Sequence, residues 1–345
     1  MIHGDALVSQ PRDQHRRPLR DLRISVMDRC NFRCPYCMPE ATYGEHFTFL
    51  TSEQRLDFDE IERLCRLAAQ LGVSKLRLTG GEPLLRPNLA ELVGRLHRIP
   101  GITDLAITTN GALLARQARE LREAGLDRVT ISLDTLDPVL FQRMAGGRGK
   151  LDDVLAGIEA ARAEGFPKGL KINTVVQRGV NESSVIELVE HFRGTGIVVR
   201  FIEYMDVGNR NHWDTSQVVP SRELLQNIHG RWPLEALPSK YPGEVATRYR
   251  FVDGEGEIGV ISSISQPFCG GCTRARLSSD GVLYTCLFAT QGKDLRALLR
   301  SGSTDEALLE VLQKVWRERT DRYSEERGKK RSQENHKIEM YYIGG

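Results

Sequence analysis

The chain has 345 residues, 40% hydrophobic and 27% charged, and its 48 Lys and Arg against 46 Asp and Glu give a formal net charge of +2. This balance is typical of globular domains and argues against general affinity for nucleic acid or anionic membranes. No apolar run approaches the roughly 20 residues that span a bilayer, and residues 1–18 lack the apolar stretch of a secretory signal. We therefore expect a cytoplasmic protein of about two domains, with no membrane or nucleic-acid partner.

Short β-like runs alternate with helical patterns from Asp21 to about Asp206. In chain order, the β-like runs are Leu22–Met27, Lys75–Thr79, Leu105–Thr109, Arg128–Leu133, Leu170–Val176 and Val198–Tyr204. Between them apolar residues recur at helical spacing, as in Ile61, Leu64 and Ala68. Six such strands predict a parallel sheet covered by helices, either a doubly wound open sheet or an incomplete (β/α) barrel. In both folds the functional loops lie at the C-terminal ends of the strands.

The pattern changes after Asp206. Two hairpins are predicted, at Arg248–Ile261 and at Ala275–Phe288, and helical patterns follow them. The charged stretch Glu325–Lys337 is most simply a solvated loop. We divide the chain accordingly into a mobile polar tail (1–18), an α/β region (19–215) and a C-terminal region (216–345).

Three of the seven cysteines follow the first predicted strand with the spacing C-x3-C-x2-C: Cys30, Cys34 and Cys37. Three thiolates on one loop can bind three irons of a 4Fe–4S cluster and leave the fourth iron open to a small molecule. The alternative is a zinc knuckle in which His46 supplies the missing ligand. Cys65, on an apolar helical face, is expected to lie in the core.

A second triad, with the spacing C-x2-C-x13-C, consists of Cys269, Cys272 and Cys286. It predicts either a second 4Fe–4S cluster with an open iron or a structural zinc site with a distant fourth ligand. Arg274 and Arg276 lie between the ligands, and paired guanidinium groups are suited to bidentate phosphate recognition. Elsewhere in a sequence, the same two residues would be charges on a solvated strand edge.

The first triad, with Tyr36 directly before its last cysteine, resembles the defining motif of the radical S-adenosylmethionine (SAM) superfamily. Gly80-Gly81-Glu82-Pro83, at the end of the second β-like run, resembles the superfamily's GGEP segment. The resemblance implies that an open iron of the first cluster binds the amino and carboxylate groups of SAM. The other residues implied to contact SAM are Tyr36, Gly81, Ser132 and Met205.

Two triads in this order around a six-strand pattern are similar to the GTP 3′,8-cyclase family of molybdenum cofactor biosynthesis, from about Asp21 to Gly345. This resemblance implies an incomplete (β/α)6 TIM-type barrel with a C-terminal α+β extension that carries the second 4Fe–4S cluster. It implies conversion of GTP to (8S)-3′,8-cyclo-7,8-dihydroguanosine 5′-triphosphate, with the C-terminal Gly344-Gly345 reaching into the active site. The residues implied to contact GTP are Arg23, Arg77, Thr108, Lys171, Arg274, Ala275 and Arg276.

The same resemblance implies a reductant that supplies electrons, a downstream cyclic pyranopterin monophosphate synthase, and a monomeric or homodimeric state. Two other functions stay open. Another radical SAM enzyme with an auxiliary cluster, for example one that modifies peptides, usually has more C-terminal cysteines than these three. A zinc protein with two knuckles that binds nucleic acid would need a basic stripe, which the near-neutral sequence lacks.

Overall fold

A computed structural model describes residues 10–330 and 336–344. Within them the strands form one twelve-stranded sheet in the order β12-β11-β10-β1-β2-β3-β4-β5-β6-β9-β8-β7. Its centre consists of parallel strands adjacent in chain order, which confirms the predicted β-like runs to within a residue or two at each end. These strands are β1 (Asp21–Met27), β2 (Lys75–Gly80), β3 (Asp104–Thr109), β4 (Arg128–Ser132), β5 (Leu170–Val176) and β6 (Val198–Glu203).

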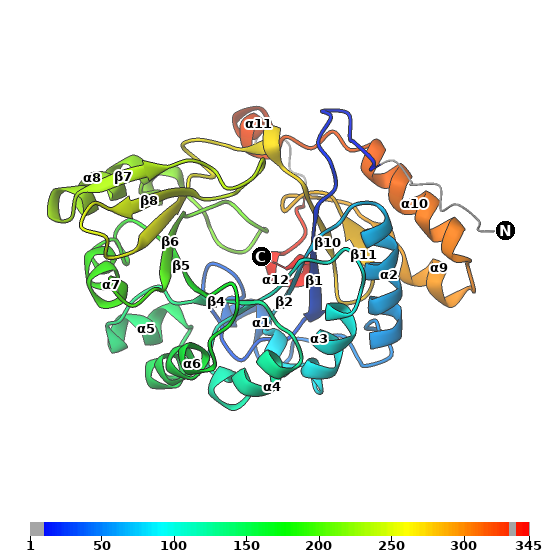
Figure 1. The fold of residues 1–345 in the computed structure, drawn as a ribbon, viewed down its shortest axis with the longest axis horizontal. Coiled ribbons are helices and arrows are strands. Elements are labelled where there is room, and N and C mark those ends of the chain that lie inside the picture. The colour runs from blue at the N-terminus through cyan, green and yellow to red at the C-terminus, as the bar shows by residue number, and fades with distance from the viewer. Residues whose placement is uncertain (1–9, 331–335, 345) are drawn as a thin grey trace.

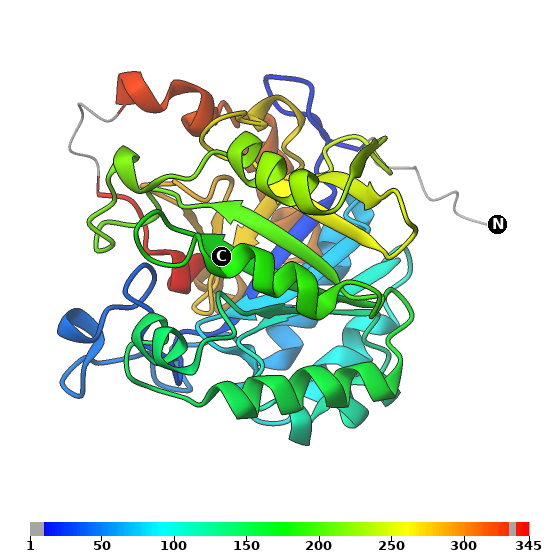
Figure 2. The ribbon, with the colours of Figure 1, turned by 90° about the vertical axis from the view of Figure 1, so that its left-hand side faces the viewer.

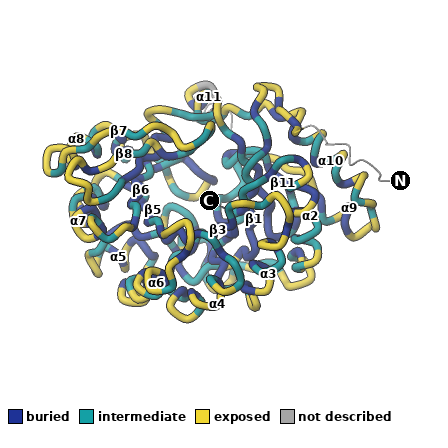
Figure 3. Tube along the Cα trace, in the orientation of Figure 1, coloured by how far each residue is buried: buried dark blue, intermediate teal, exposed yellow. Residues whose placement is uncertain are grey.

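Helices connect these strands and cover the outer side of the sheet (Figure 1). They are α2 (Phe58–Gln70), α3 (Leu89–His97), α4 (Ala118–Glu123), α5 (Pro138–Met144), α6 (Leu151–Glu164) and α7 (Ser184–Phe192). Shorter helical turns are α1 (Glu40–Tyr43), η1 (Pro83–Leu85), η2 (Leu114–Arg116) and η3 (Thr215–Gln217). Figure 3 shows buried residues along the strands and exposed residues on the outer faces of the helices.

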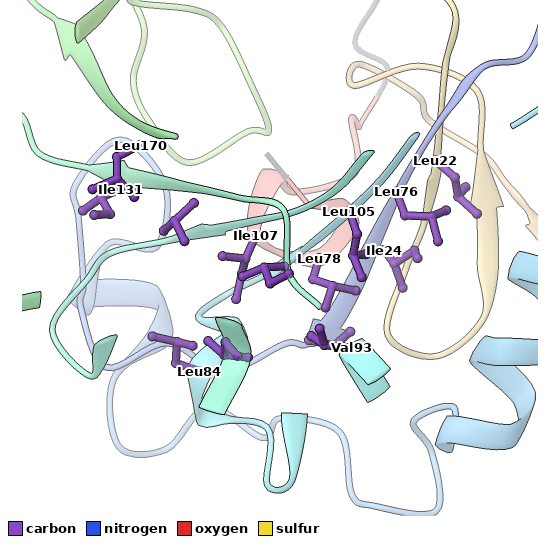
Figure 4. Close-up of a cluster of buried hydrophobic side chains, with 14 of the residues drawn as sticks. Leu22, Ile24, Leu76, Leu78, Leu84, Val93, Leu105, Ile107, Ile131 and Leu170 are labelled. Atoms are coloured by element: carbon purple, nitrogen blue, oxygen red, sulfur yellow. The ribbon is translucent and has the colours of Figure 1, made fainter. Parts of the chain in front are cut away.

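The hydrophobic core lies between the sheet and these helices. Alternate strand residues face it, because successive side chains of a strand point to opposite sides of the sheet. Figure 4 shows the core side chains Leu22, Ile24, Leu76, Leu78, Leu105 and Ile107 of β1 to β3, with Val93 of α3. The residues between them in sequence face the opposite, inner side of the sheet. This period of two decides which side chains line the site.

The C-terminal region extends the sheet at both ends instead of forming a separate layer. The two predicted hairpins are confirmed, and β10 pairs in parallel with β1 while β9 pairs in parallel with β6. The strands are β7 (Leu234–Leu237), β8 (Thr247–Phe251), β9 (Glu257–Ile261), β10 (Arg274–Leu277), β11 (Val282–Tyr284) and β12 (Lys293–Asp294). The helices are α8 (Ser221–Arg231), η4 (Cys269–Gly271), α9 (Arg296–Arg300), α10 (Asp305–Arg317), α11 (Tyr323–Lys330) and α12 (Met340–Ile343).

Two segments differ from the expectation of solvated or mobile chain. Residues 10–18 pack beside α10, where the Trp316 indole N–H donates to the Arg17 carbonyl oxygen over 3.0 Å. The first nine residues of the predicted tail lie outside the described residues. Part of the predicted charged loop forms α11, in which Arg327 is buried because it pairs with Asp206 over 2.9 Å.

The last described turn, α12, lies against β1 and β2 (Figures 1 and 2). Its Tyr341 ring is buried 4.8 Å from the Tyr43 ring, and the Tyr342 hydroxyl donates to Asp280. These contacts hold residues 340–343 beside the centre of the sheet. No helix among residues 10–330 and 336–344 is both long enough and apolar enough to cross a membrane.

Candidate active site

A cavity of about 710 Å³ lies on the inner side of the sheet, and both cysteine triads line it. Successive side chains of β1 point to opposite sides of the sheet, and this produces the lining. Leu22 and Ile24 are buried in the core under the helices, while Arg23, between them, faces the cavity. The same alternation brings polar residues of six further strands to the cavity wall: Arg77, Thr108, Ser132, Lys171, Arg200, Arg274 and Arg276. The core and the candidate site therefore occupy opposite faces of the same strands.

The first triad lies in the loop that follows β1. The Phe32 amide donates to Cys30 Sγ over 3.3 Å, and the Asn110 side-chain amide lies 3.8 Å from the same sulfur. Burial, with a smaller contribution from Glu82, raises the pKa of Cys30 to about 12, and burial also raises the pKa of Cys34 and Cys37. Cysteine binds metal as the thiolate. These buried thiols have raised pKa values, so they would ionise when a metal cation binds to them. Their donor set fits an iron–sulfur cluster.

Two glycines bring the end of β2 against the cysteine loop. Gly80 has a φ of +145°, and a Cβ placed on it would lie 2.2 Å from the Met27 carbonyl oxygen. A Cβ on Gly81 would lie 2.2 Å from the Arg29 carbonyl oxygen, and the Gly81 amide donates to the Met27 carbonyl oxygen over 2.7 Å. Only residues without a side chain permit this close approach of two backbones. The GGEP segment thus fixes the loop that carries the first triad.

Gly81→Ala should therefore displace the cysteine loop and lower the iron that reconstituted protein retains at the first triad by severalfold. Gly230→Ala on α8 is the matched control, because nothing lies within 4 Å of a Cβ at that position. It should leave iron content unchanged and stabilise the fold by up to about 1 kcal/mol. The measurements are iron per chain and thermal unfolding. Wild-type iron retention in Gly81→Ala would contradict this role of the glycine.

Two buried carboxylates form hydrogen bonds between the ends of neighbouring strands and loops. Buried Glu82 accepts hydrogen bonds from the Thr109 hydroxyl and the Asn110 amide, each over 2.7 Å, and burial raises its pKa to about 7. The Tyr36 hydroxyl donates to Asp134 over 2.7 Å, and burial raises the pKa of Asp134 to about 6. The residues predicted to contact SAM all line the cavity: Tyr36, Gly81, Ser132 and Met205.

The second triad lies across the cavity, on η4 and after β11. Guanidinium nitrogens of Arg274 and Arg319 lie 3.3 Å and 3.2 Å from Cys272 Sγ. Burial raises the pKa of Cys272, but the two cations outweigh it and bring the pKa down to about 6. Burial and nearby Asp321 raise the pKa of Cys286 to about 12. The structure thus provides one thiolate already stabilised by two arginines, which fits a metal ligand.

Within residues 10–330 and 336–344, no three His, Cys, Asp or Glu side chains are grouped so as to hold a single metal ion.

A row of arginines crosses three adjacent strands between the triads. The strand registers place Arg23 opposite Arg276 on one side and opposite Arg77 on the other. Burial, together with the neighbouring arginines, lowers the pKa of Arg23 well below its ordinary value; burial is also the main cause that lowers the pKa of Arg276 to about 9 and of Arg77 to about 10. Like charges directly opposite one another are destabilising, so an anion bound along the row would relieve this repulsion.

Further polar groups on the wall lack partners. Arg276 Nη1, Thr108 Oγ1 and Asn173 Oδ1 are buried without a hydrogen-bond partner in the part of the chain that the structure describes. Buried polar atoms are normally satisfied, so these three atoms on the cavity wall are available to the donors and acceptors of a ligand or of water. Burial, with Arg200 and other cations, also lowers the pKa of Lys171 to about 7. The cavity fits a polyanion that carries additional polar groups.

One predicted residue does not face the cavity. Ala275 lies between Arg274 and Arg276 on β10, and its side chain is buried in the core beside Leu22 and Leu283. Successive side chains of a strand point to opposite sides of the sheet, so Ala275 points away from the cavity that Arg274 and Arg276 line. Only the Ala275 backbone remains available to a ligand.

The C-terminal glycine pair is partly described. Gly344 has a φ of +72°, and a Cβ on it would lie 2.3 Å from the Thr79 side chain, which lines the cavity. Gly345 lies outside the described residues.

Sequence reasoning missed Arg200, Arg319 and Asn110. Arg200 had a signal, because an arginine inside the run Val198–Tyr204 interrupts an otherwise apolar strand and needs a polar partner on one face. Burial, together with Arg77 and Arg128, lowers its pKa to about 9. Arg319 follows the charged helix α10, which ends at Arg317, and nothing local distinguishes it from its exposed neighbours.

Comparisons with known proteins agree with this geometry. A family model of the radical SAM superfamily matches residues 24–192, and a model described as Molybdenum Cofactor Synthesis C matches residues 197–325. Streptococcus suis SuiB bound to S-adenosylmethionine has a similar fold, with a TM-score of 0.60 at 18% identity over 86% of this chain and 65% of that chain. A structure of anSMEcpe with bound AdoMet and the Kp18Cys peptide gives 0.54 at 15% identity, over 86% and 84% of the two chains.

The fold and the first cysteine triad together define a radical SAM protein. Among curated relatives, the GTP 3′,8-cyclase of Xanthomonas campestris pv. campestris is 56% identical over 341 residues, which cover 99% of each chain. Those of Acidothermus cellulolyticus and Staphylococcus aureus are 51% and 47% identical, over 98% of this chain and all of theirs. The chain belongs to the GTP 3′,8-cyclase family.

Proposed function

We propose that the inner cavity binds SAM beside the first triad and GTP along the arginine row, and that the chain converts GTP to (8S)-3′,8-cyclo-7,8-dihydroguanosine 5′-triphosphate. This is the first step of molybdenum cofactor biosynthesis. The row Arg276–Arg23–Arg77 carries the proposal, because its mutual repulsion is relieved by a triphosphate held between the two triads. Family membership supports this substrate over a peptide.

The arrangement of the six central strands supports an incomplete (β/α)6 barrel. They are parallel and adjacent in chain order, their helices cover the outer side, and the cavity lies on the inner side. The C-terminal strands β9 and β10 continue the sheet at its two ends, which encloses the cavity further. In this proposal the α+β extension contributes one side of the substrate site.

The residues at the first triad would hold a 4Fe–4S cluster and SAM. When bound, the cluster and SAM supply an electron and an adenosyl group that removes a hydrogen atom from the substrate. Phe32 and Asn110 orient the Cys30 sulfur, while Tyr36 and Asp134 fix the wall beside Ser132 through their mutual hydrogen bond. Gly81 keeps β2 close enough for its backbone to contact SAM.

The second triad would hold a second 4Fe–4S cluster, with an open iron facing the guanine of GTP. Arg274 lies between the second triad and the arginine row: it donates to Cys272 Sγ and packs over the Phe268 ring, 5.2 Å from its centroid. Its guanidinium is therefore oriented before substrate arrives. Gly344 lies against Thr79 at the end of β2, on the side of the first triad, and would limit the entry of water there.

The proposal also requires an external reductant and a downstream cyclic pyranopterin monophosphate synthase that consumes the product. We expect the chain to work as a monomer or a homodimer, because the described residues of one chain already provide both triads and the whole arginine row.

Affinity for a nucleotide series tests whether the arginine row binds the triphosphate. Each hydrogen bond to a charged group contributes about 1.5–3 kcal/mol, so GTP should bind at least about 100-fold more tightly than GMP to anaerobically reconstituted protein. Guanosine should bind more weakly still. Equal affinity for GTP and GMP, measured by calorimetry, would show that the row does not hold the phosphates.

The lowered pKa of Lys171 predicts that GTP affinity depends on pH. Burial and neighbouring cations bring this pKa to about 7 in the free protein, whereas a bound triphosphate favours the protonated amine and raises it. GTP binding should therefore take up protons above pH 7, and affinity should fall by up to about tenfold per pH unit there. Lys171→Arg should weaken this dependence, because arginine stays protonated. A dependence identical in both proteins, in calorimetry with two buffers, would contradict the assignment.

A further inference from the structure

A buried charged network connects the N-terminal segment with the second triad. Asp13 accepts a hydrogen bond from Arg17 Nε over 2.6 Å and pairs with Arg319 Nη1 over 3.4 Å. All three residues are at most 5% exposed. Desolvating charged groups is costly, and a network of this kind is weak evidence for stability by itself. Stability alone therefore does not account for the network, and its contacts indicate a positioning role.

The two arginines of this network hold the backbone of the second triad. Arg17 Nη1 donates to the Cys269 carbonyl oxygen over 2.8 Å, and Arg319 Nη1 donates to the Cys272 carbonyl oxygen over 2.8 Å. Arg319 also donates from Nη2 to Cys272 Sγ over 3.2 Å. One guanidinium thus fixes both the main chain and the sulfur of the same ligand.

The packing of α10 sets the orientation of Arg319. Its guanidinium carbon lies 4.6 Å from the centre of the Trp316 ring, and the Trp316 indole N–H donates to the Arg17 carbonyl oxygen. Asp13, between the two arginines, neutralises part of their charge. The N-terminal segment and α10 therefore meet at this network, and neither contributes a side-chain ligand to the triad.

We infer that Asp13, Arg17 and Arg319 form a positioning network for the second cysteine triad, in which Arg319 orients Cys272 and tunes the group that the triad holds. The inference rests on the proposed second cluster. Hydrogen bonds to cluster sulfurs help to set reduction potentials, and a cation beside the sulfur stabilises the more negative, reduced state. The network gives residues 10–18 a role in the chemistry of a site more than 250 residues away in sequence.

The test isolates the second triad by replacing Cys30, Cys34 and Cys37 with Ser. In this background we compare Arg319→Gln with Arg317→Gln, an exposed arginine two residues away. Iron per chain, the electron paramagnetic resonance spectrum and the midpoint potential are measured after anaerobic reconstitution. We expect Arg319→Gln to lower the potential, change the spectrum and speed loss of iron in air severalfold, while Arg317→Gln matches the background.

The outcomes separate this inference from the proposed function. A background protein that binds no cluster while Arg319 is intact would reject the second cluster itself. A background protein whose cluster keeps the same spectrum, potential and lifetime after Arg319→Gln would reject the network alone. If Arg319→Gln does not fold, Asp13→Asn decides: a shifted potential supports the inference, and an unchanged potential and lifetime overturn it.

Discussion

Replacing Cys34 with Ser should reduce the formation of 5′-deoxyadenosine by more than about 100-fold. The loss of an outer partner of a metal ligand already costs about 10- to 100-fold in affinity or activity, and the loss of the ligand itself exceeds that. Cys34 lies in the enclosed loop after β1, where no other thiol except Cys30 and Cys37 is present to replace it among the described residues. Iron content at the first triad should fall with activity.

Cys65→Ser is the control for this prediction. Cys65 lies in the core on α2 and is fully buried, away from the cavity lining. Burying a hydroxyl there should lower the free energy of unfolding by about 1–3 kcal/mol. Activity per folded chain and iron content should match the wild type. Activity retained in Cys34→Ser, or iron lost equally in Cys65→Ser, would contradict the assignment of the first triad.

Arg276→Ala should weaken GTP binding and stabilise the protein without ligand. The lost charge-assisted hydrogen bonds correspond to about 1.5–3 kcal/mol, or about 10- to 150-fold in affinity. The same change removes a cation opposite Arg23 and a buried nitrogen without a partner, so the free energy of unfolding should rise by about 1 kcal/mol. Opposite signs for binding and stability are expected at a site that is organised around its ligand.

Arg250→Ala provides the matched strand control. Arg250 lies on β8 at the other end of the sheet and forms an exposed pair with Glu235, which contributes at most about 1 kcal/mol. It should change neither GTP affinity nor cluster content. If Arg276→Ala binds GTP as tightly as the wild type, Arg276 does not contact GTP. If the variant loses both clusters, its weaker GTP binding results from damage to the structure and not from a lost contact.

Much of the site could be predicted from strand periodicity. Once β1, β2 and β10 are located, the period of two places Arg23, Arg77 and Arg276 on the face opposite the leucines. The parallel registers then bring the three guanidinium groups together. The same period of two places the Ala275 side chain in the core and not in the cavity. The resemblance to a family motif does not show this, because it concerns only the position of the residue in the sequence.

The remaining features depend on contacts between distant segments. Asp13 and Arg319 are 306 positions apart, and Arg327 is buried against Asp206, which lies 121 positions earlier in the chain and pairs with it over 2.9 Å. A polar segment such as residues 10–18 has no apolar pattern that predicts packing. Its order comes from pairing with α10, which local sequence does not show.

Transfer of deuterium from GTP labelled at ribose C3′ tests the account most directly. The protein is reconstituted anaerobically with iron and sulfide, given dithionite, SAM and labelled GTP, and the 5′-deoxyadenosine is analysed by mass spectrometry. We predict one deuterium in the deoxyadenosine, since the arginine row holds GTP in the same cavity as the first triad. Deoxyadenosine without deuterium, formed at a rate indifferent to GTP, would contradict GTP as the substrate.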